Sequence, residues 1–169
     1  MQNTQKTQIM LATTEDLDYI MQIYARAKKY MVETGNPNQW NGSYPERELL
    51  EQDIAKNQLY VYKVDGQVHA VFAFIIGEDA TYAYIEDGRW LNNKPYGTIH
   101  RIASDGLYKG VLVKCVDYCA EQIDNLRADT HHDNKIMQHL LEKNGFERCG
   151  IIYLQSGAPR VAYHRRNIR

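Results

Sequence analysis

The amino-acid sequence predicts a single α/β domain over residues 1–169, with a central mixed sheet and helices on both of its faces. Segments with the apolar periods of strands and of helices alternate along the chain, without an internal repeat or a linker. One Asp-Gly pair between two apolar runs predicts a hairpin. One strand ends in a glycine loop that opens a helix, which is typical of parallel strand–helix–strand units.

The first elements follow from apolar spacing and capping residues. Residues 8–12 predict a strand, and Thr13 with Asp16 resembles a capping box that opens a helix. After a loop over residues 35–44, Pro45 predicts the first turn of a short helix. The apolar face of the longer helix is predicted at Leu17, Ile20, Met21, Tyr24 and Met31.

The middle of the chain combines a clear hairpin with a segment that has no clear period. Residues 59–64 and 67–76 predict two strands that join at Asp65-Gly66. Residues 77–96 hold several large aromatic side chains among polar residues. We expect this segment to form a partly irregular pocket wall.

The second half begins with a strand–helix–strand unit. Residues 99–104 and 126–130 predict two strands that pair in parallel across the helix between them. Asp133 is predicted to cap a further helix, which Asn144-Gly145 ends in the left-handed geometry that glycine allows. The inner face of that helix is predicted to hold Ile136, Met137, Leu140 and Leu141.

Two C-terminal strands complete the predicted sheet. The first covers residues 146–154, and a turn at Ser156-Gly157 leads into the second around residues 161–163. We interpret the basic run over residues 164–169 as a solvated tail.

Composition excludes several classes of protein. The net charge is −1 and the isoelectric point is near 6.6, which argues against a nucleic-acid binder with a basic face. The sequence has no apolar run of membrane-spanning length, and its polar start does not resemble a signal peptide. Three cysteines, an odd number, favour reduced thiols and a cytoplasmic location.

The stretch from Ile99 to Val111 predicts an anion site. A short apolar strand leads into a turn at Asp105-Gly106, and Gly110 then opens a helix. The first amides of a helix have no intrahelical partner, and the helix dipole favours negative charge beside them. The chain is therefore expected to bind a phosphate or pyrophosphate there.

Two segments of the chain resemble the GNAT superfamily of N-acetyltransferases. Residues 134–146 read N-x-x-M-x-x-L-L-x-K-x-G-F, similar to the family segment N-x-x-A-x-x-L-Y-x-K-x-G-F. The strand IHRIAS before the phosphate loop is the second segment. The resemblance implies an α+β fold with a mixed, mostly antiparallel sheet of six to seven strands. It also implies transfer of an acetyl group from acetyl-CoA to a primary amine of a small molecule or peptide by direct attack.

The resemblance also implies where acetyl-CoA binds as co-substrate. Backbone groups of the 102–104 strand would pair with the pantetheine arm, and amides of the glycine loop would hold the pyrophosphate. A residue of the later helix would contact the same molecule. The cofactor-binding residues expected in this way are Ile102, Ala103, Ser104, Leu107, Lys109, Gly110, Val111, Leu112 and Asn134.

The sequence departs from the family pattern at two places. The family loop reads Q/R-x-x-G-x-G/A, whereas this chain has Leu107-x-x-Gly110-x-Leu112 and so lacks the leading polar residue and the final small one. The positive charge of Lys109 either compensates for these two differences in the binding of phosphate, or Lys109 is simply a solvated surface residue. Leu141 stands where many family members carry the tyrosine that protonates the leaving thiolate.

His100 and Glu86 are the two candidate catalytic bases. Alternation along the strand places His100, Ile102 and Ser104 on one face and Arg101 on the other. An imidazole titrates near neutrality, and some superfamily members place a base at the position of His100. A hydrogen-bonded structural histidine remains the alternative. Arg101 is interpreted as a structural ion-pair residue or a partner contact, not as a catalyst.

Aromatic side chains and possible ligands have competing interpretations. Trp40, Trp90 and Tyr96 are candidate walls of the acceptor pocket, or they anchor loops on the core. His131-His132-Asp133 is interpreted as a strand-to-helix cap, since adjacent strand residues point to opposite faces. Cys115 and Cys119 are interpreted as core packing. We predict no metal site.

Two other functions stay open at this point. A non-enzymatic acyl-CoA-binding module with degenerate catalytic residues would explain Leu141 and the altered loop. A nucleotide-binding protein of another kind fits the glycine loop but not residues 134–146. A homodimer is also left open.

Overall fold

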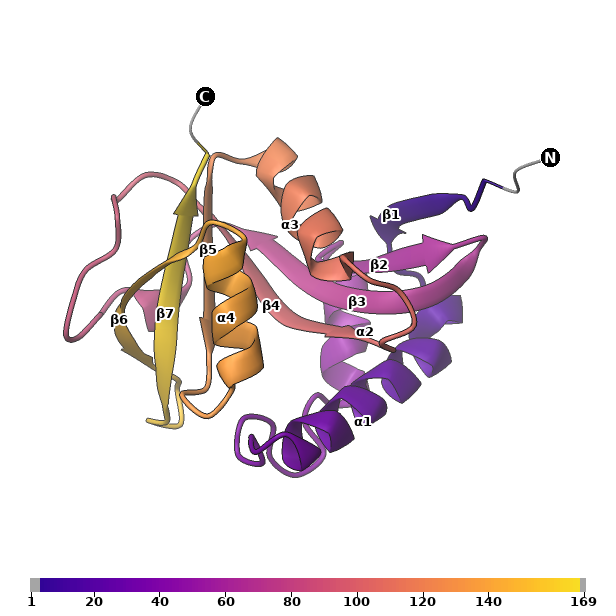
Figure 1. Ribbon diagram of the computed structural model, residues 1–169, viewed down its shortest axis with the longest axis horizontal. Coiled ribbons are helices and arrows are strands. Elements are labelled where there is room, and N and C mark those ends of the chain that lie inside the picture. Colours follow the sequence, from indigo (N-terminus) through magenta and orange to yellow (C-terminus); the bar gives the residue numbers. More distant parts are fainter. Residues whose placement is uncertain (1–3, 168–169) are drawn as a thin grey trace.

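A seven-stranded sheet with the strand order β1-β2-β3-β4-β5-β7-β6 forms the centre of the molecule (Figure 1). The computed structural model describes residues 4–167. The elements are β1 (Thr7–Leu11), η1 (Thr14–Asp16), α1 (Leu17–Glu33), α2 (Arg47–Ala55), β2 (Leu59–Val64), β3 (Gln67–Ile76), η2 (Ala80–Tyr82), β4 (Gly97–Ser104), α3 (Val111–Gln122), β5 (Asn125–Thr130), α4 (Lys135–Lys143), β6 (Glu147–Tyr153) and β7 (Pro159–Arg166). Neighbouring strands are antiparallel except β4 and β5, which are parallel. The predicted fold class and the parallel strand–helix–strand unit are therefore confirmed.

Helices cover both faces of the sheet, as the alternating periods predict. One core lies between the sheet and α1 with α2, and a second core lies between the opposite face and α3 with α4 (Figure 1). Cys115 and Cys119 are fully buried in the second core, which confirms that they pack there. Burial raises the pKa of Cys115 to about 12, so its thiol stays protonated.

At the helix ends, the structure confirms one prediction from the sequence and corrects two. Thr13 and Asp16 form the predicted capping box, in which Thr13 N–H donates to the Asp16 carboxylate at 2.9 Å. Pro45 lies before α2, because the helix begins only at Arg47. Asn134, not Asp133, caps α4, since its Oδ1 accepts the Met137 N–H at 3.0 Å.

Two predictions about the C-terminal part of the chain, one in α4 and one in β7, were wrong. Ile136 does not lie on the inner face of α4, because 41% of it is exposed. Residues 164–166 are not a solvated tail, since β7 continues through them. His164 is fully buried and shares a hydrogen bond of 2.9 Å with Asn125 on the neighbouring strand. The predicted tail residues 168 and 169 lie outside the described residues.

A bulge in β4 overturns the predicted alternation of its side chains. His100 pairs with Ala73, but Ala103 pairs with Val71, so β4 has one extra residue over this interval. Arg101 has a φ of 50°, a left-handed backbone that absorbs the extra residue. His100 therefore lies on a different face from Ile102, which packs in the core under α3 and α4.

The bulge lies close to the place where β4 and β5 separate. The two strands pair only at Gly97–Leu126 and Thr98–Arg127. Beyond Thr98 the β5-facing edge of β4 has no strand partner. Backbone groups of β4 are thus available to a ligand at the centre of the sheet.

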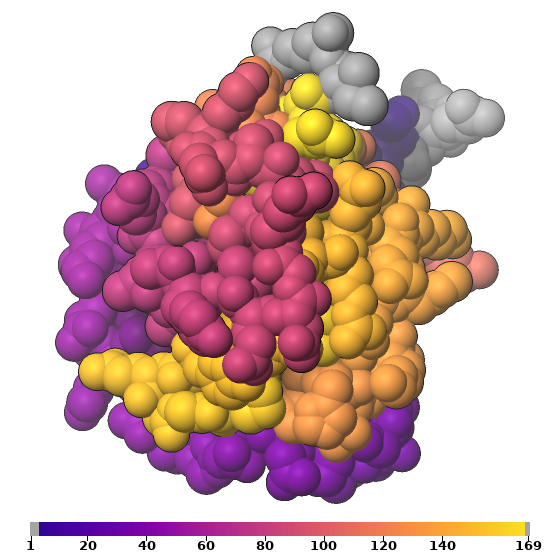
Figure 2. Space-filling view, turned by 90° about the vertical axis from the view of Figure 1, so that its left-hand side faces the viewer, coloured from indigo at the N-terminus to yellow at the C-terminus, as the bar shows by residue number. Residues whose placement is uncertain are grey.

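Residues 77–96 form the irregular segment that the sequence predicts. They contain η2 and one bridge, between Glu86 and Ile151, as the only regular structure in this described segment. In Figure 2 this segment, in rose, forms a continuous mass on the surface beside the C-terminal strands in yellow. Tyr82 and Tyr96 anchor it by packing on Ile152 of β6 and Ala162 of β7.

Among residues 4–167, no helix has the length and apolar composition of a membrane span.

Candidate active site

A narrow cleft opens where β4 and β5 separate. Its volume is about 40 Å³, and it is lined by side chains from both strands, from α3 and from α4. Ile102, Leu112 and Asn134, three of the expected cofactor residues, line this cleft. Leu141 also lines it and is only 4% exposed, so it packs in the core as well. The cleft therefore has no phenolic acid at the position of Leu141.

The N-terminus of α3 lies beside the cleft and fits an anion. Gly110 precedes the helix with a φ of 71°, and no side chain caps the first turn. A 12-residue helix thus keeps its first amides available, and Lys109 is exposed next to them. Val111 begins the helix and is buried in the core, where it fixes the direction of the first turn.

The loop before α3 uses some of its own amides. Asp105 accepts a hydrogen bond from Leu107 N–H at 3.1 Å and shares one of 2.6 Å with His69 Nδ1. The Leu107 amide is therefore engaged inside the loop, although its side chain is 66% exposed. Ser104 pairs with Ala70 of β3, which places the start of the loop. Ala103, in contrast, points into the core under α1 and α2.

A larger cavity of about 600 Å³ lies next to the cleft. It is lined by the loop after α1, by the start of segment 77–96, by β4 and by the β6–β7 connection. The cavity and the cleft share Gln39, Trp40, Arg101 and Asp129 as lining residues. The two spaces thus meet at these side chains.

His100 faces the larger cavity together with Asp79. His100 Nε2 lies 3.1 Å from Asp79 Oδ2. The hydrogen bond from His100 is the main cause that lowers the pKa of Asp79 to about 2, and Thr81 adds to it. An ionised carboxylate only accepts hydrogen bonds, so neutral His100 carries its proton on Nε2 and its lone pair on Nδ1.

Asp79 is itself held in place by three hydrogen bonds. Its backbone N–H donates to the Tyr96 hydroxyl at 2.8 Å. Its Oδ1 accepts from the backbone and hydroxyl groups of Thr81 at 2.9 and 2.7 Å, as the cap of η2. Tyr96 therefore supports Asp79 instead of lining the cavity.

The other expected site residues lie in different places. Glu86 and its neighbour Tyr153 form a hydrogen bond with each other, and neither is among the residues that line the cavity. Trp40 lines both spaces. Trp90 stacks instead on the Arg127 guanidinium, 4.0 Å from its ring centre, and so anchors segment 77–96.

Arg101 forms the ion pair that the sequence suggested. Its guanidinium bonds Asp53 of α2, and its backbone carbonyl accepts the Tyr24 hydroxyl at 2.8 Å. These contacts hold the bulge of β4 in its left-handed conformation.

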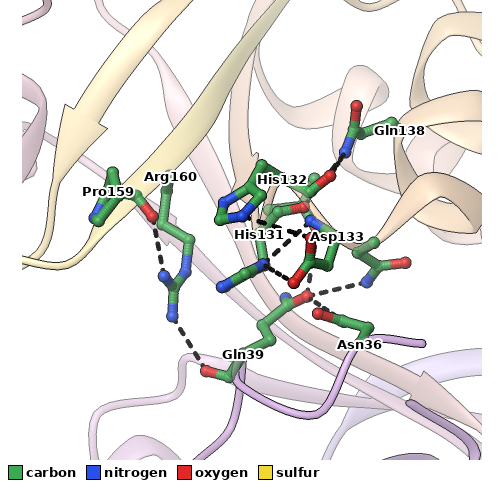
Figure 3. A network of polar contacts seen from close by, with 10 residues as sticks. Asn36, Gln39, His131, His132, Asp133, Gln138, Pro159 and Arg160 are labelled. Atoms are coloured by element: carbon green, nitrogen blue, oxygen red, sulfur yellow. Dashed lines mark hydrogen bonds and ion pairs between the residues drawn. The ribbon is translucent and has the colours of Figure 1, made fainter. Parts of the chain in front are cut away.

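Gln39 connects the loop after α1 to the ends of three other elements (Figure 3). Its Oε1 accepts hydrogen bonds from Asn36 at 2.8 Å, from Thr130 at the end of β5 at 3.3 Å and from Asn134 at the start of α4 at 2.9 Å. Its backbone carbonyl accepts from Arg160 of β7 at 3.0 Å. The Asn134 side chain is thus shared between capping α4 and holding Gln39 at the junction of the two spaces.

His131, His132 and Asp133 carry ligand-type atoms within 4.8 Å of one another. His131 Nδ1 already accepts the Asp133 N–H at 3.0 Å, and Gln138 of α4 donates to the His132 carbonyl at 2.9 Å (Figure 3). The segment therefore forms a turn that leads from β5 into α4.

Comparisons with known proteins give the family. No protein-family model matches the chain, and no curated protein matches it. Among solved structures, the GNAT family acetyltransferase from Streptococcus agalactiae 2603 is 32% identical, with 96% of each chain covered and a TM-score of 0.86. The chain belongs to the GNAT family of acetyltransferases.

Two more solved structures share the fold at lower identity. The acetyltransferase from Listeria monocytogenes 4b F2365 is 15% identical, with 95% of each chain covered and a TM-score of 0.71. AAC(6')-Ib in complex with ribostamycin and coenzyme A is 18% identical over 96% of this chain and 94% of that one, with a TM-score of 0.64.

The sequence analysis did not identify several residues that line the cavity. Asp79 had a usable signal, because Asp-x-Thr is typical of a side-chain cap at a turn. Gln39, Asp129 and Arg160 carried no local signal, since each reaches the site only through the fold.

Proposed function

We propose that this GNAT protein is an N-acetyltransferase that moves the acetyl group of acetyl-CoA to a primary amine of a small molecule or peptide. The observation that supports it most is the junction of two spaces. A cleft beside a free helix N-terminus meets a cavity in which His100 and Asp79 form a hydrogen-bonded pair.

The donor would bind in the cleft. Acetyl-CoA supplies an activated thioester and a pyrophosphate. The pyrophosphate would accept hydrogen bonds from the amides at Gly110 and the first turn of α3. The free edge of β4, from Ile102 to Ser104, would pair with the pantetheine arm.

The acceptor amine would bind in the cavity near the junction. An amine attacks only when it is neutral, so its proton must be removed. His100 Nδ1 takes that proton, directly or through a water, and Asp79 stabilises the imidazolium that results. The amine nitrogen forms the new bond to the acetyl carbon, the carbon–sulfur bond breaks, and coenzyme A leaves as the thiolate.

Leu141 cannot protonate that thiolate. The Tyr153 hydroxyl bonds Glu86, and Tyr153 is not among the lining residues. The thiolate therefore leaves as the anion or takes its proton from solvent.

A panel of primary amines incubated with acetyl-CoA tests the proposal. We expect release of coenzyme A that depends on the amine, with an equal amount of N-acetyl product by mass spectrometry. Binding of acetyl-CoA with only slow hydrolysis, and with no turnover of any amine, would instead support the non-enzymatic acyl-CoA-binding module.

A further inference from the structure

We propose that Arg160 forms a subsite for an anionic group of the acceptor, so that the preferred acceptors are small zwitterions with a primary amine and a carboxylate. This inference deepens the acetyltransferase function proposed above. It depends on the charges that line the larger cavity.

Arg160 lines the cavity as a buried cation that is bonded only to neutral groups. It is 6% exposed. Its guanidinium donates to the backbone carbonyls of Pro159 at 2.8 Å and of Gln39 at 3.0 Å (Figure 3). Those bonds use two of its five N–H groups, and within residues 4–167 no carboxylate forms an ion pair with it. Asp129 attracts this guanidinium through space but does not form an ion pair with it. The remaining N–H groups of the buried cation are therefore available to an anionic ligand.

Asp129 is the complementary charge on the same face of the sheet. It pairs with Ala162 across β5 and β7, so Arg160 is its diagonal neighbour on that face. Diagonal neighbours of this kind have their Cβ atoms about 7–8 Å apart or slightly less. Asp129 also lines the junction with the cleft, and its carboxylate accepts the Tyr82 hydroxyl at 2.6 Å. It is therefore placed to attract an ammonium group.

The other charged side chains of the cavity already have bonded partners. Arg101 forms an ion pair with Asp53, and Asp79 is hydrogen-bonded to His100. Asp129 and Arg160 attract each other without a direct ion pair, so each can also bind an opposite charge on a ligand. That arrangement complements a zwitterion whose amine lies near Asp129 and whose carboxylate reaches Arg160. A polycation would place a positive group beside Arg160, which costs free energy.

Matched acceptor pairs test the subsite. Each natural amino acid is compared with its decarboxylated amine, and spermidine serves as the polycation. We expect the best amino acid to exceed its own amine by about 10- to 100-fold in kcat/KM, the value of a hydrogen-bonded charge pair. Arg160→Gln should remove that advantage, because the KM of the amino acid should rise by a much larger factor than the KM of the amine. Arg160→Lys should keep part of the advantage.

A calorimetric titration separates the subsite from the catalytic function. The N-acetylated amino acid retains its carboxylate, and we expect wild-type protein to bind it at least about 10-fold more tightly than Arg160→Gln does. This result, without turnover of any amine, would support the subsite and refute the acetyltransferase function. Three outcomes would overturn the subsite and leave the acetyltransferase function standing. They are equal kcat/KM for amino acids and their amines, a preference for spermidine, and an equal loss of kcat/KM for both acceptor types in Arg160→Gln. Equal binding of the N-acetyl amino acid by both proteins would also overturn it.

Discussion

The two spaces that meet at Gln39 and Asp129 are built in different ways. The cleft is made by regular elements, namely the separating strands β4 and β5 and the first turn of α3. The larger cavity is made by side chains from segments far apart in the sequence, such as Tyr44, Asp79 and Arg160. The proposed donor site thus depends mainly on backbone groups and the proposed acceptor site on side chains. Substitutions should therefore affect the two halves of the reaction separately.

The largest expected effect is on turnover in His100→Ala. If His100 is the base, kcat should fall by about 10²- to 10⁴-fold. Glu86→Ala is the matched control, because Glu86 is not among the lining residues and should leave kcat unchanged. Steady-state kinetics at saturating acetyl-CoA measure both. A reversed result, with loss only in Glu86→Ala, would transfer the role of base to Glu86.

Gly110→Pro should weaken the donor site. Proline removes one amide and cannot adopt the left-handed backbone at this position, where φ is 71°. One or more hydrogen bonds to a charged group, each of about 1.5–3 kcal/mol, would be lost, so the Kd of acetyl-CoA should rise by about 10- to 100-fold. Calorimetry measures that Kd.

Gly66→Pro controls for the backbone strain. Gly66 also has a positive φ, of 84°, but it lies in the β2–β3 turn. An unchanged acetyl-CoA affinity in Gly110→Pro, with the circular dichroism spectrum intact, would refute the pyrophosphate site.

Asp79→Asn should have a smaller effect on the acceptor side. Asparagine retains the cap of η2 but removes the charge that stabilises the imidazolium of His100. One charge-assisted hydrogen bond corresponds to about a 10-fold fall in kcat. The KM of acetyl-CoA should stay constant. An equal loss of kcat and of acetyl-CoA affinity would show that Asp79 only supports the loop.

The smallest effect on catalysis is expected from His164, which holds segment 77–96 on the sheet and affects the stability of the fold. His164 Nδ1 accepts the Leu91 N–H of segment 77–96 at 3.2 Å, and burial lowers the pKa of His164 from 6.5 to about 4. The unfolded chain therefore binds more protons between these pH values, so stability falls as the pH drops from about 6.5 to about 4. The slope from this group is at most about 1.4 kcal/mol per pH unit.

Urea unfolding across this pH range checks the slope. His164→Gln keeps a neutral donor and acceptor, and it should unfold with a shallower dependence on pH than the wild type. Equal slopes in both proteins would show that His164 does not titrate with folding.

The fold was predictable from the sequence where local signals decide it. The Asp65-Gly66 turn fixes the β2–β3 hairpin, and its strands have the predicted bounds. The strand–glycine–helix pattern likewise gave the parallel pair β4 and β5. Both features depend on residues that are neighbours in the chain.

The acceptor site was harder to predict because it depends on long-range contacts. The left-handed conformation of Arg101 has no signature in the sequence, because Asp53 and Tyr24 hold it from other elements. The predicted alternation failed there, and with it the face assigned to His100. Trp40 lines the cavity, whereas Trp90 packs on Arg127 as a loop anchor.

The most direct measurement determines the acetyl-CoA Kd and the kcat together in His100→Ala and Gly110→Pro. We predict a crossed result, in which His100→Ala loses turnover with an unchanged Kd and Gly110→Pro loses affinity with kcat at saturation within about 3-fold of wild type. If each variant changes both quantities to the same extent, the donor and acceptor sites are not separate, and the proposed division of the reaction between cleft and cavity is wrong.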